Sequence, residues 1–172
     1  EHLRADNLKQ YGLDYNSIKK INPKIMYCSI TGFGQNGPYS KRGGYDYLVQ
    51  AMGGIMSITG KKKGDPTKIG VGVSDIITGL YSSIAILSAL RFKEITGNGQ
   101  HIDISLMDSQ VSWLSYVAQG YLLSGQIPER IGNDHPSIVP YQTVKAKNGL
   151  MGIAIANDRQ CKDFCNFAKI YN

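Results

Sequence analysis

The sequence has 172 residues, of which 42% are hydrophobic and 19% are charged, and its formal net charge is +6. This length is enough for a domain with a buried core, and the composition is that of a globular protein without low-complexity tracts. The positive charge suits an anionic partner, but no nucleic-acid-binding motif accompanies it, so we expect no nucleic acid as partner. Three cysteines, Cys28, Cys161 and Cys165, exclude a disulfide framework by number and spacing and favour a reducing compartment.

Membrane and metal binding are not expected either. The longest apolar stretch, residues 76–90, is interrupted by threonine, glycine and serine and falls short of the roughly 20 residues that span a membrane. The three histidines, His2, His101 and His135, have no metal-ligand spacing on one element, so we expect no metal site. The sequence lacks an initiator methionine and stops within an expected helix, which predicts a piece of a longer protein.

Short elements are expected along the first part of the chain. Residues 5–11 and 14–22 have the pattern of short helices, and residues 24–30 are rich in β-forming side chains and predict a buried strand. Residues 31–44 contain five glycines and a proline and predict a loop. A short helix is expected over residues 45–54.

Residues 75–95 give the clearest helical pattern. Four apolar side chains, spaced by four, four and three positions, form one face of this helix: Ile76, Leu80, Ile84 and Leu87. Ile77, Ile86 and Leu90 widen this apolar surface. We therefore expect a mostly buried helix, which the glycines of residues 96–100 bring to an end.

The remaining elements complete an alternation of strands and helices. Residues 101–107 alternate polar and apolar side chains as a strand does, and a second long helix is expected over residues 108–124. Residues 141–156 predict a hairpin with its turn at Asn148-Gly149, and a last helix begins near Asp158. This alternation favours the α/β class, with one domain portion over 1–124 and a linker with the start of a smaller domain over 125–172.

Two apparent motifs point to no chemistry. The glycines of "GFGQNG" (32–37) match a dinucleotide-binding pattern, but Pro38 follows where a helix would have to begin, so a nucleotide site is not expected. His101 and Asp103 are two positions apart on the expected strand and could form a pair. The polar side of a half-buried strand is the more common explanation of this pattern.

Asp75 is the candidate nucleophile that remains, because no serine or cysteine has a nucleophile motif. Its position at the start of the expected helix is also that of an ordinary helix cap, and local pattern does not choose between the two roles. A capping position would lower the pKa of the carboxyl and keep it ionised, as a nucleophilic carboxylate must be.

Two long stretches resemble the central part of the class III coenzyme A transferases. They are "GGYDYLVQAMGGIMSITG" (43–60) and "VGVSDIITGLYSSIAILSALRFKEITGNGQHIDISLMDSQ" (71–110). They contain the G-Y-D helix start, the D-x-x-x-G helix start and the helix end resembling K-T-G-x-G-Q of that family. The resemblance implies the class III CoA-transferase fold, here its central portion only, with Rossmann-like elements, long buried helices and a C-terminal hairpin.

The resemblance also implies the roles of particular residues. The family's catalytic aspartate falls on Asp75, and an active-site tyrosine falls on Tyr45. Tyr45, Gly44, Gly72 and Gly34 are the expected coenzyme A-binding residues, and no metal is implied. The family's E-N-F-x-P-G-like stretch reads "EHLRADNL" here, which departs from the pattern at His2, Leu3 and Asp6.

The reaction implied by the resemblance moves coenzyme A from an acyl-CoA to a carboxylic acid through aspartyl anhydride and thioester intermediates. "YCSITGFGQNGP" and "PSIVPYQTVKAKNG" are most similar to the mitochondrial succinate–hydroxymethylglutarate transferase subfamily. This similarity implies succinyl-CoA as donor, a dicarboxylic acid as acceptor, a mitochondrial location and a homodimer. The coenzyme A thioester is then a substrate, and no permanently bound cofactor is expected.

Two alternatives stay open. The α-methylacyl-CoA racemases of the same superfamily use a histidine before an aspartate, where this chain has Tyr45-Asp46. A neutral phenol is a poor base near pH 7, which argues for acyl transfer. The other alternative is a truncated, inactive product, because members of the family are over twice as long.

Overall fold

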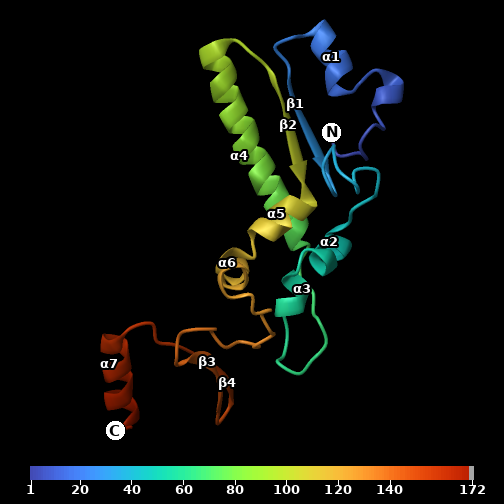
Figure 1. The fold of residues 1–172 in the computed structure, drawn as a ribbon. Helices are drawn as coiled ribbons and strands as arrows, with labels where there is room; N and C mark the ends of the chain where they lie inside the picture. Colours follow the sequence, from blue (N-terminus) through green and yellow to red (C-terminus); the bar gives the residue numbers. More distant parts are fainter. Residues whose placement is uncertain (171–172) are drawn as a thin grey trace. The chain divides into compact units, whose positions relative to one another are not determined.

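The computed structural model describes residues 1–170, and Figure 1 shows its elements. The chain divides into two compact units. The first unit comprises Glu1–Ser57 and Thr67–Pro128, and the second comprises Ile58–Pro66 and the chain from Glu129 onward.

The first unit begins with short elements and contains the longest helix of the described chain. Its elements, in chain order, are η1 (Lys9–Tyr11), α1 (Tyr15–Ile21), β1 (Met26–Thr31), α2 (Asp46–Met52), α3 (Ile55–Ile58, whose last residue belongs to the second unit), α4 (Val73–Thr96), β2 (Gln100–Ser105), α5 (Leu106–Ser112) and α6 (Ser115–Ser124). The loop expected over residues 31–44 is confirmed, and η1 is only the last part of the helix expected over 5–11.

A pair of parallel strands, β1 and β2, is the centre of this unit, with α4 alongside (Figure 1). Their register runs from Met26 opposite Gln100 to Thr31 opposite Ser105. The connection at the end of α4 needs glycine, because a Cβ on Gly99 would collide with the carbonyl oxygen of Ile25. The apolar core includes Val49, Ile77, Ala89 and Ile102.

Helix α4 begins earlier than the sequence pattern indicates. Its first residue is Val73 and its N-cap is Gly72, so Asp75 lies in the first turn and is not the cap that was expected. Its end agrees with the expectation, because Gly97 adopts a left-handed conformation at φ 73° and its N–H donates to the carbonyl of Lys93.

The buried face of α4 is only partly the one expected: Ile77 is buried as predicted, but the main predicted face is not. The residues that pack inward are Val73, Ser74, Ile77, Thr78, Ser82 and Ala89. The predicted core face is exposed, with Ile76 53%, Leu80 56%, Ile84 60% and Leu87 65% accessible. The helix is therefore buried on one side only in the described structure.

The expectation that no apolar stretch is long enough to span a membrane does not hold for α4. By length and composition it could cross a membrane, with a mean hydropathy of 1.6 over its most apolar window. This is weak evidence for a membrane span, because a core helix passes the same test, and α4 packs against β1, β2 and α5.

The expected long helix over 108–124 is two helices. α5 ends at Ser112 and α6 begins at Ser115, whose φ of 48° turns the backbone between them. Neither glycine nor proline marks this break, so the sequence pattern did not show it. Ser105 caps α5, because its Oγ accepts a 2.9 Å hydrogen bond from the N–H of Asp108.

The second unit contains the hairpin and the last helix. Strands β3 (Tyr141–Ala146) and β4 (Gly149–Ala154) are antiparallel, with Ala146 opposite Gly149. The hairpin is confirmed, but its two turn residues are Lys147 and Asn148, one position earlier than expected. Helix α7 (Asp158–Ala168) begins where it was expected, after the N-cap Asn157.

Candidate active site

Asp75 lies in the first turn of α4, with its side chain exposed to solvent. Gly72, the residue before that turn, leaves space beside the carboxylate. A Cβ placed on Gly72 would lie 3.4 Å from Oδ2 of Asp75 and 3.7 Å from Cγ of Asp46. The structure therefore brings together the predicted Asp75 and Gly72 and adds a second carboxylate from α2.

Asp46 supplies the cap that α4 lacks. Gly72 has no side chain to accept a hydrogen bond, and Oδ1 of Asp46 accepts a 2.9 Å bond from the N–H of Ser74. A carboxylate at a helix N-terminus is favourable because the first N–H groups have no partner within the helix. The start of α4 is thus capped by a residue of another helix.

Two buried glutamines complete the polar surroundings of this helix start. Nε2 of Gln50 donates to Oδ2 of Asp46 at 2.8 Å, and the hydroxyl of Ser74 donates to Oε1 of Gln110 at 2.8 Å. Both glutamines are fully buried. They bond two neighbours of Asp75, Asp46 and Ser74. Among the described residues both ends of the Gln50 amide have partners, whereas Nε2 of Gln110 has none.

The electrostatics at Asp75 differ from the expectation for a helix cap. Although Asp75 is exposed by accessible surface, neighbouring protein atoms remove part of the hydration of its carboxyl and raise the pKa above its ordinary value, and the negative charge of Asp46 raises it further. The expected lowering of this pKa was wrong, because it considered the helix end and neither the loss of hydration nor the neighbouring carboxylate. A raised pKa makes the ionised carboxylate a stronger base.

Tyr45 and Gly44 lie at a different hollow, of about 280 Å³. The same hollow is lined by His2, Leu3 and two arginines, Arg4 and Arg42. Gly44 packs directly against Gly32, since a Cβ on Gly32 would lie 2.5 Å from the Cα of Gly44. Tyr45 is 75% exposed and immediately precedes Asp46, so this hollow and the Asp75 region are joined by one short segment of chain.

Gly34 lies in a turn just after β1. Its φ of 84° favours glycine, and its N–H donates to Oγ1 of Thr31 at 2.8 Å. Its surroundings are Asp103 and Ser105 at the end of β2, so the structure does not bring it to Asp75 or Tyr45.

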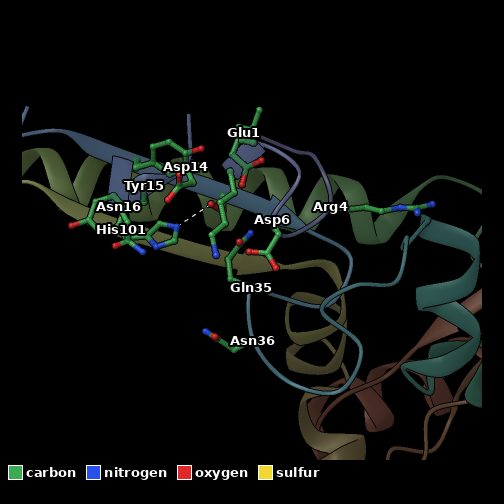
Figure 2. A pocket seen from close by; sticks show the side chains of 13 residues that line it. Glu1, Arg4, Asp6, Asp14, Tyr15, Asn16, Gln35, Asn36 and His101 are labelled. Atoms are coloured by element: carbon green, nitrogen blue, oxygen red, sulfur yellow. Dashed lines mark hydrogen bonds between the residues drawn. The ribbon is translucent and has the colours of Figure 1, made fainter. Parts of the chain in front are cut away.

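A polar pocket of about 400 Å³ lies over β1 and β2 and is not lined by Asp75 (Figure 2). Here Nε2 of His101 lies 2.9 Å from Oγ of Ser29, and the imidazole stacks on the ring of Tyr15 at 4.7 Å. Asp103 instead accepts hydrogen bonds from the N–H of Gln35. His101 and Asp103 therefore form no pair, and the polar side of a strand explains both.

Within residues 1–170, no group of three or more histidine, cysteine, aspartate or glutamate side chains is placed to hold a metal ion. The features that sequence reasoning missed are Asp46, Gln50 and Gln110. Asp46 and Gln50 are four positions apart, as residues on one helical face are, but their function depends on the contact between α2 and α4.

The parallel strand pair, the long crossing helix and the aspartate at its start define an α/β protein with a carboxylate-centred site. The model of CoA-transferase family III matches residues 1–170, and the chain therefore belongs to this family. The α/β class and the class III transferase fold expected from the sequence are confirmed.

Several relatives give this membership more detail. The chain is 50% identical to the succinate–glutarate CoA-transferase of Agrobacterium fabrum, over 99% of this chain and 42% of that protein. It is 46% identical to the human succinyl-CoA:glutarate CoA-transferase, over 96% of this chain and 38% of that protein. A crystal structure of a CaiB/BaiF family protein from Brucella suis superimposes with a TM-score of 0.87 at 50% identity, over 99% of this chain and 45% of that one. The chain thus spans about two fifths of the length of these relatives.

Proposed function

We propose that the protein carrying this chain transfers coenzyme A from succinyl-CoA to a dicarboxylic acid, with Asp75 as the nucleophile. The observation that carries the proposal is the carboxylate of Asp75 beside the bare Cα of Gly72 at the start of α4. No side chain of Gly72 obstructs a carbonyl group that approaches this carboxylate. The names of the relatives, which include succinate, succinyl-CoA and glutarate, support the substrate class.

The reaction begins when an oxygen of Asp75 attacks the thioester carbonyl. The carbon–sulfur bond breaks, the coenzyme A thiolate leaves, and an acyl–aspartyl anhydride remains. The thiolate attacks the aspartyl carbonyl, which releases the first acid and forms an aspartyl-CoA thioester. The acceptor carboxylate then repeats both steps in reverse order and regenerates the free carboxylate of Asp75. Each step exchanges one acyl bond for another, so the activation of the thioester is conserved.

The surroundings of Asp75 suit these steps. Every attack creates an oxyanion, which backbone N–H groups stabilise best when no side chain keeps them at a distance. Gly70 and Gly72 provide such backbone immediately before the nucleophile. The raised pKa of Asp75 makes its ionised carboxylate a stronger nucleophile.

The hollow beside Tyr45 is the proposed contact for coenzyme A. The phosphates of coenzyme A need cations, and Arg4 and Arg42 lie at this hollow together with the side-chain-free backbone of Gly43 and Gly44. Tyr45 would line the path of the thioester arm. Gly34 does not line this hollow. We propose for it an indirect role, in which its turn fixes the course of the loop that also contains Gly43 and Gly44.

The test uses the full product of the gene that encodes this chain. Incubation with succinyl-CoA and glutarate is expected to give glutaryl-CoA and succinate, which chromatography separates. Hydroxylamine added during turnover should convert the aspartyl intermediate to a hydroxamate, and peptide mass spectrometry should find it on Asp75. Asp75→Ala should abolish transfer, whereas Asp163→Ala on the exposed surface of α7 should not. Full transfer by Asp75→Ala would exclude the proposed nucleophile.

The racemase alternative predicts a different product. In deuterated water it would place deuterium at the α-carbon of a 2-methylacyl-CoA without exchange of the acyl group. Deuterium incorporation without transfer to any carboxylic acid would overturn the transferase proposal.

Assembly and location are proposals that rest on the same resemblance. We expect the full gene product to be a homodimer in a mitochondrion, with no membrane as partner. Sedimentation velocity and fractionation of the producing cells test these expectations. A 172-residue chain that neither binds coenzyme A nor folds when produced alone would favour the truncated, inactive alternative for this chain.

A further inference from the structure

Gln50 is a buried polar residue that the reaction does not use directly. It lies on α2, one turn after Asp46, and none of its surface is accessible. Its amide nitrogen donates to Oδ2 of Asp46 at 2.8 Å and to the carbonyl of Val71 at 3.3 Å. Its amide oxygen accepts a 2.8 Å hydrogen bond from the N–H of Ile69.

These bonds connect two parts of the chain that converge on Asp75. The bonds to Ile69 and Val71 hold the loop that leads into α4. The bond to Asp46 continues to the first turn of α4, because the other oxygen of that carboxylate accepts the N–H of Ser74. Gly72 and Asp75 lie where these two connections meet.

The hydrogen bond from Gln50 to Asp46 also stabilises a carboxylate that lies close to Asp75. Within residues 1–170 neither Asp46 nor Asp75 has an ion-pair partner, and both approach Gly72. A hydrogen bond to an ionised carboxylate is stronger than one between neutral groups, so the amide of Gln50 is an important partner of Asp46. Without this hydrogen bond, the carboxylate of Asp46 would be free to adopt other orientations.

We propose that Gln50 is a positioning residue for the reaction: it orients Asp46 and the 69–71 loop, and through them the carboxylate of Asp75. The catalytic part of this inference rests on the proposed transferase function. The structural part does not, because it concerns hydrogen bonds that exist without substrate.

Two variants distinguish the effect of losing the donor of the Gln50 amide from that of losing its acceptor. Gln50→Met has a similar size and removes all three hydrogen bonds. Gln50→Glu keeps an acceptor for the N–H of Ile69 and replaces the donor that faces Asp46. Gln142, exposed on β3 in the second unit, provides the matched controls Gln142→Met and Gln142→Glu.

Hydrogen exchange of the backbone amides is measured first, on the full gene product. The N–H of Ser74 is expected to exchange at least about tenfold faster in both Gln50 variants, because each loses the donor that fixes Asp46. The N–H of Ile69 should exchange faster in Gln50→Met only. Ala89, deep in α4, should be unaffected in Gln50→Glu. If the exchange of Ser74 is unchanged in Gln50→Glu, the proposal is overturned.

Transfer from succinyl-CoA to glutarate is measured second, on the full gene product. Both Gln50 variants are expected to lower kcat by about tenfold or more, with KM for succinyl-CoA changed less than about twofold. Unchanged kcat in Gln50→Glu would overturn the catalytic part. Absence of transfer in the unmodified protein would refute the proposed function, and the exchange of Ser74 would still decide whether Gln50 positions the helix start.

Discussion

Gly72 shows how a single missing side chain shapes the candidate site. Its φ of −72° and ψ of 68° are those of an inverse γ-turn, which other residues also adopt, so backbone conformation does not require glycine here. A larger residue at position 72 would fill the space beside Asp75, because its Cβ would lie 3.4 Å from Oδ2 of that carboxylate.

We predict that Gly72→Ala lowers transfer activity by about tenfold to a hundredfold, because its methyl group occupies the approach to the carboxylate. The free energy of unfolding should change by no more than about 1 kcal/mol, the range of N-cap substitutions. Gly120→Ala, on α6, is the control, since no atom lies within 4 Å of its added Cβ. Equal activity of the two variants would contradict the proposed approach.

A second prediction concerns pH. Loss of hydration and then the charge of Asp46 raise the pKa of Asp75, and the nucleophile must be ionised, so activity falls as the pH drops through this raised pKa. Asp46→Asn removes the charge and lowers the pKa of Asp75 toward its ordinary value. The acidic limb of the profile of kcat/KM against pH should therefore move to lower pH.

The position of the limb is the readout, because loss of hydrogen bonds in Asp46→Asn also reduces the maximal rate. Asp163→Asn, at an exposed position of α7 in the second unit, makes the same change of charge and should leave the limb in place. An acidic limb that stays in place, or moves to higher pH, in Asp46→Asn would show that Asp46 does not act on Asp75 as described.

At the scale of elements, α4 shows what the sequence pattern can and cannot provide. The apolar period predicted the helix, and Gly97 marked its end correctly. The start was wrong by two residues because its cap, Asp46, comes from α2, and local capping rules consider only the residues next to the helix. The buried face was also partly wrong, since small residues such as Ser74, Ser82 and Ala89 pack against the sheet and α5 instead of most of the large apolar ones.

The same limit applies to the site. Asp75, Gly72 and Tyr45 could be named because the family resemblance places them, and the proximity of Gly72 to Asp75 followed from sequence neighbours. Gln50 and Gln110 could not be named, because each acts through a contact more than 18 positions away in the chain. The division into domains at residues 124 and 125 stays a prediction.

Gly79 gives a prediction for α4 itself. It occupies the glycine of the D-x-x-x-G pattern, yet a Cβ added there meets no atom within 4 Å. Gly79→Ala should therefore raise the free energy of unfolding of the 172-residue chain by about 0.5–1 kcal/mol, the usual gain for alanine in a helix interior. Urea denaturation followed by circular dichroism measures it.

Gly32→Ala is the contrasting variant, because its Cβ would lie 2.5 Å from the Cα of Gly44. Overpacking of this kind costs typically about 1–3 kcal/mol. A destabilised Gly79→Ala chain would mean that the space beside this glycine is occupied when the chain folds.

At the scale of the whole molecule, the exposed face of α4 is the most conspicuous feature of the described chain. Ile76, Leu80, Ile84 and Leu87 succeed one another along one side of the helix, each more than half accessible. Contiguous apolar surface of this kind is rare on monomeric proteins and favours association. The chain spans about two fifths of the length of the relatives it matches.

We predict that the 172-residue chain, produced alone, associates with itself through this face. Sedimentation velocity should show species that grow with protein concentration, and Ile84→Glu with Leu87→Glu should return the chain to a monomer, because two charges cannot be buried unpaired. The matched control is Leu150→Glu, which changes a residue that is 78% exposed on β4. Association that persists in the double variant, or that Leu150→Glu alone abolishes, would contradict this prediction. In either case the contact would lie outside the exposed apolar face of α4.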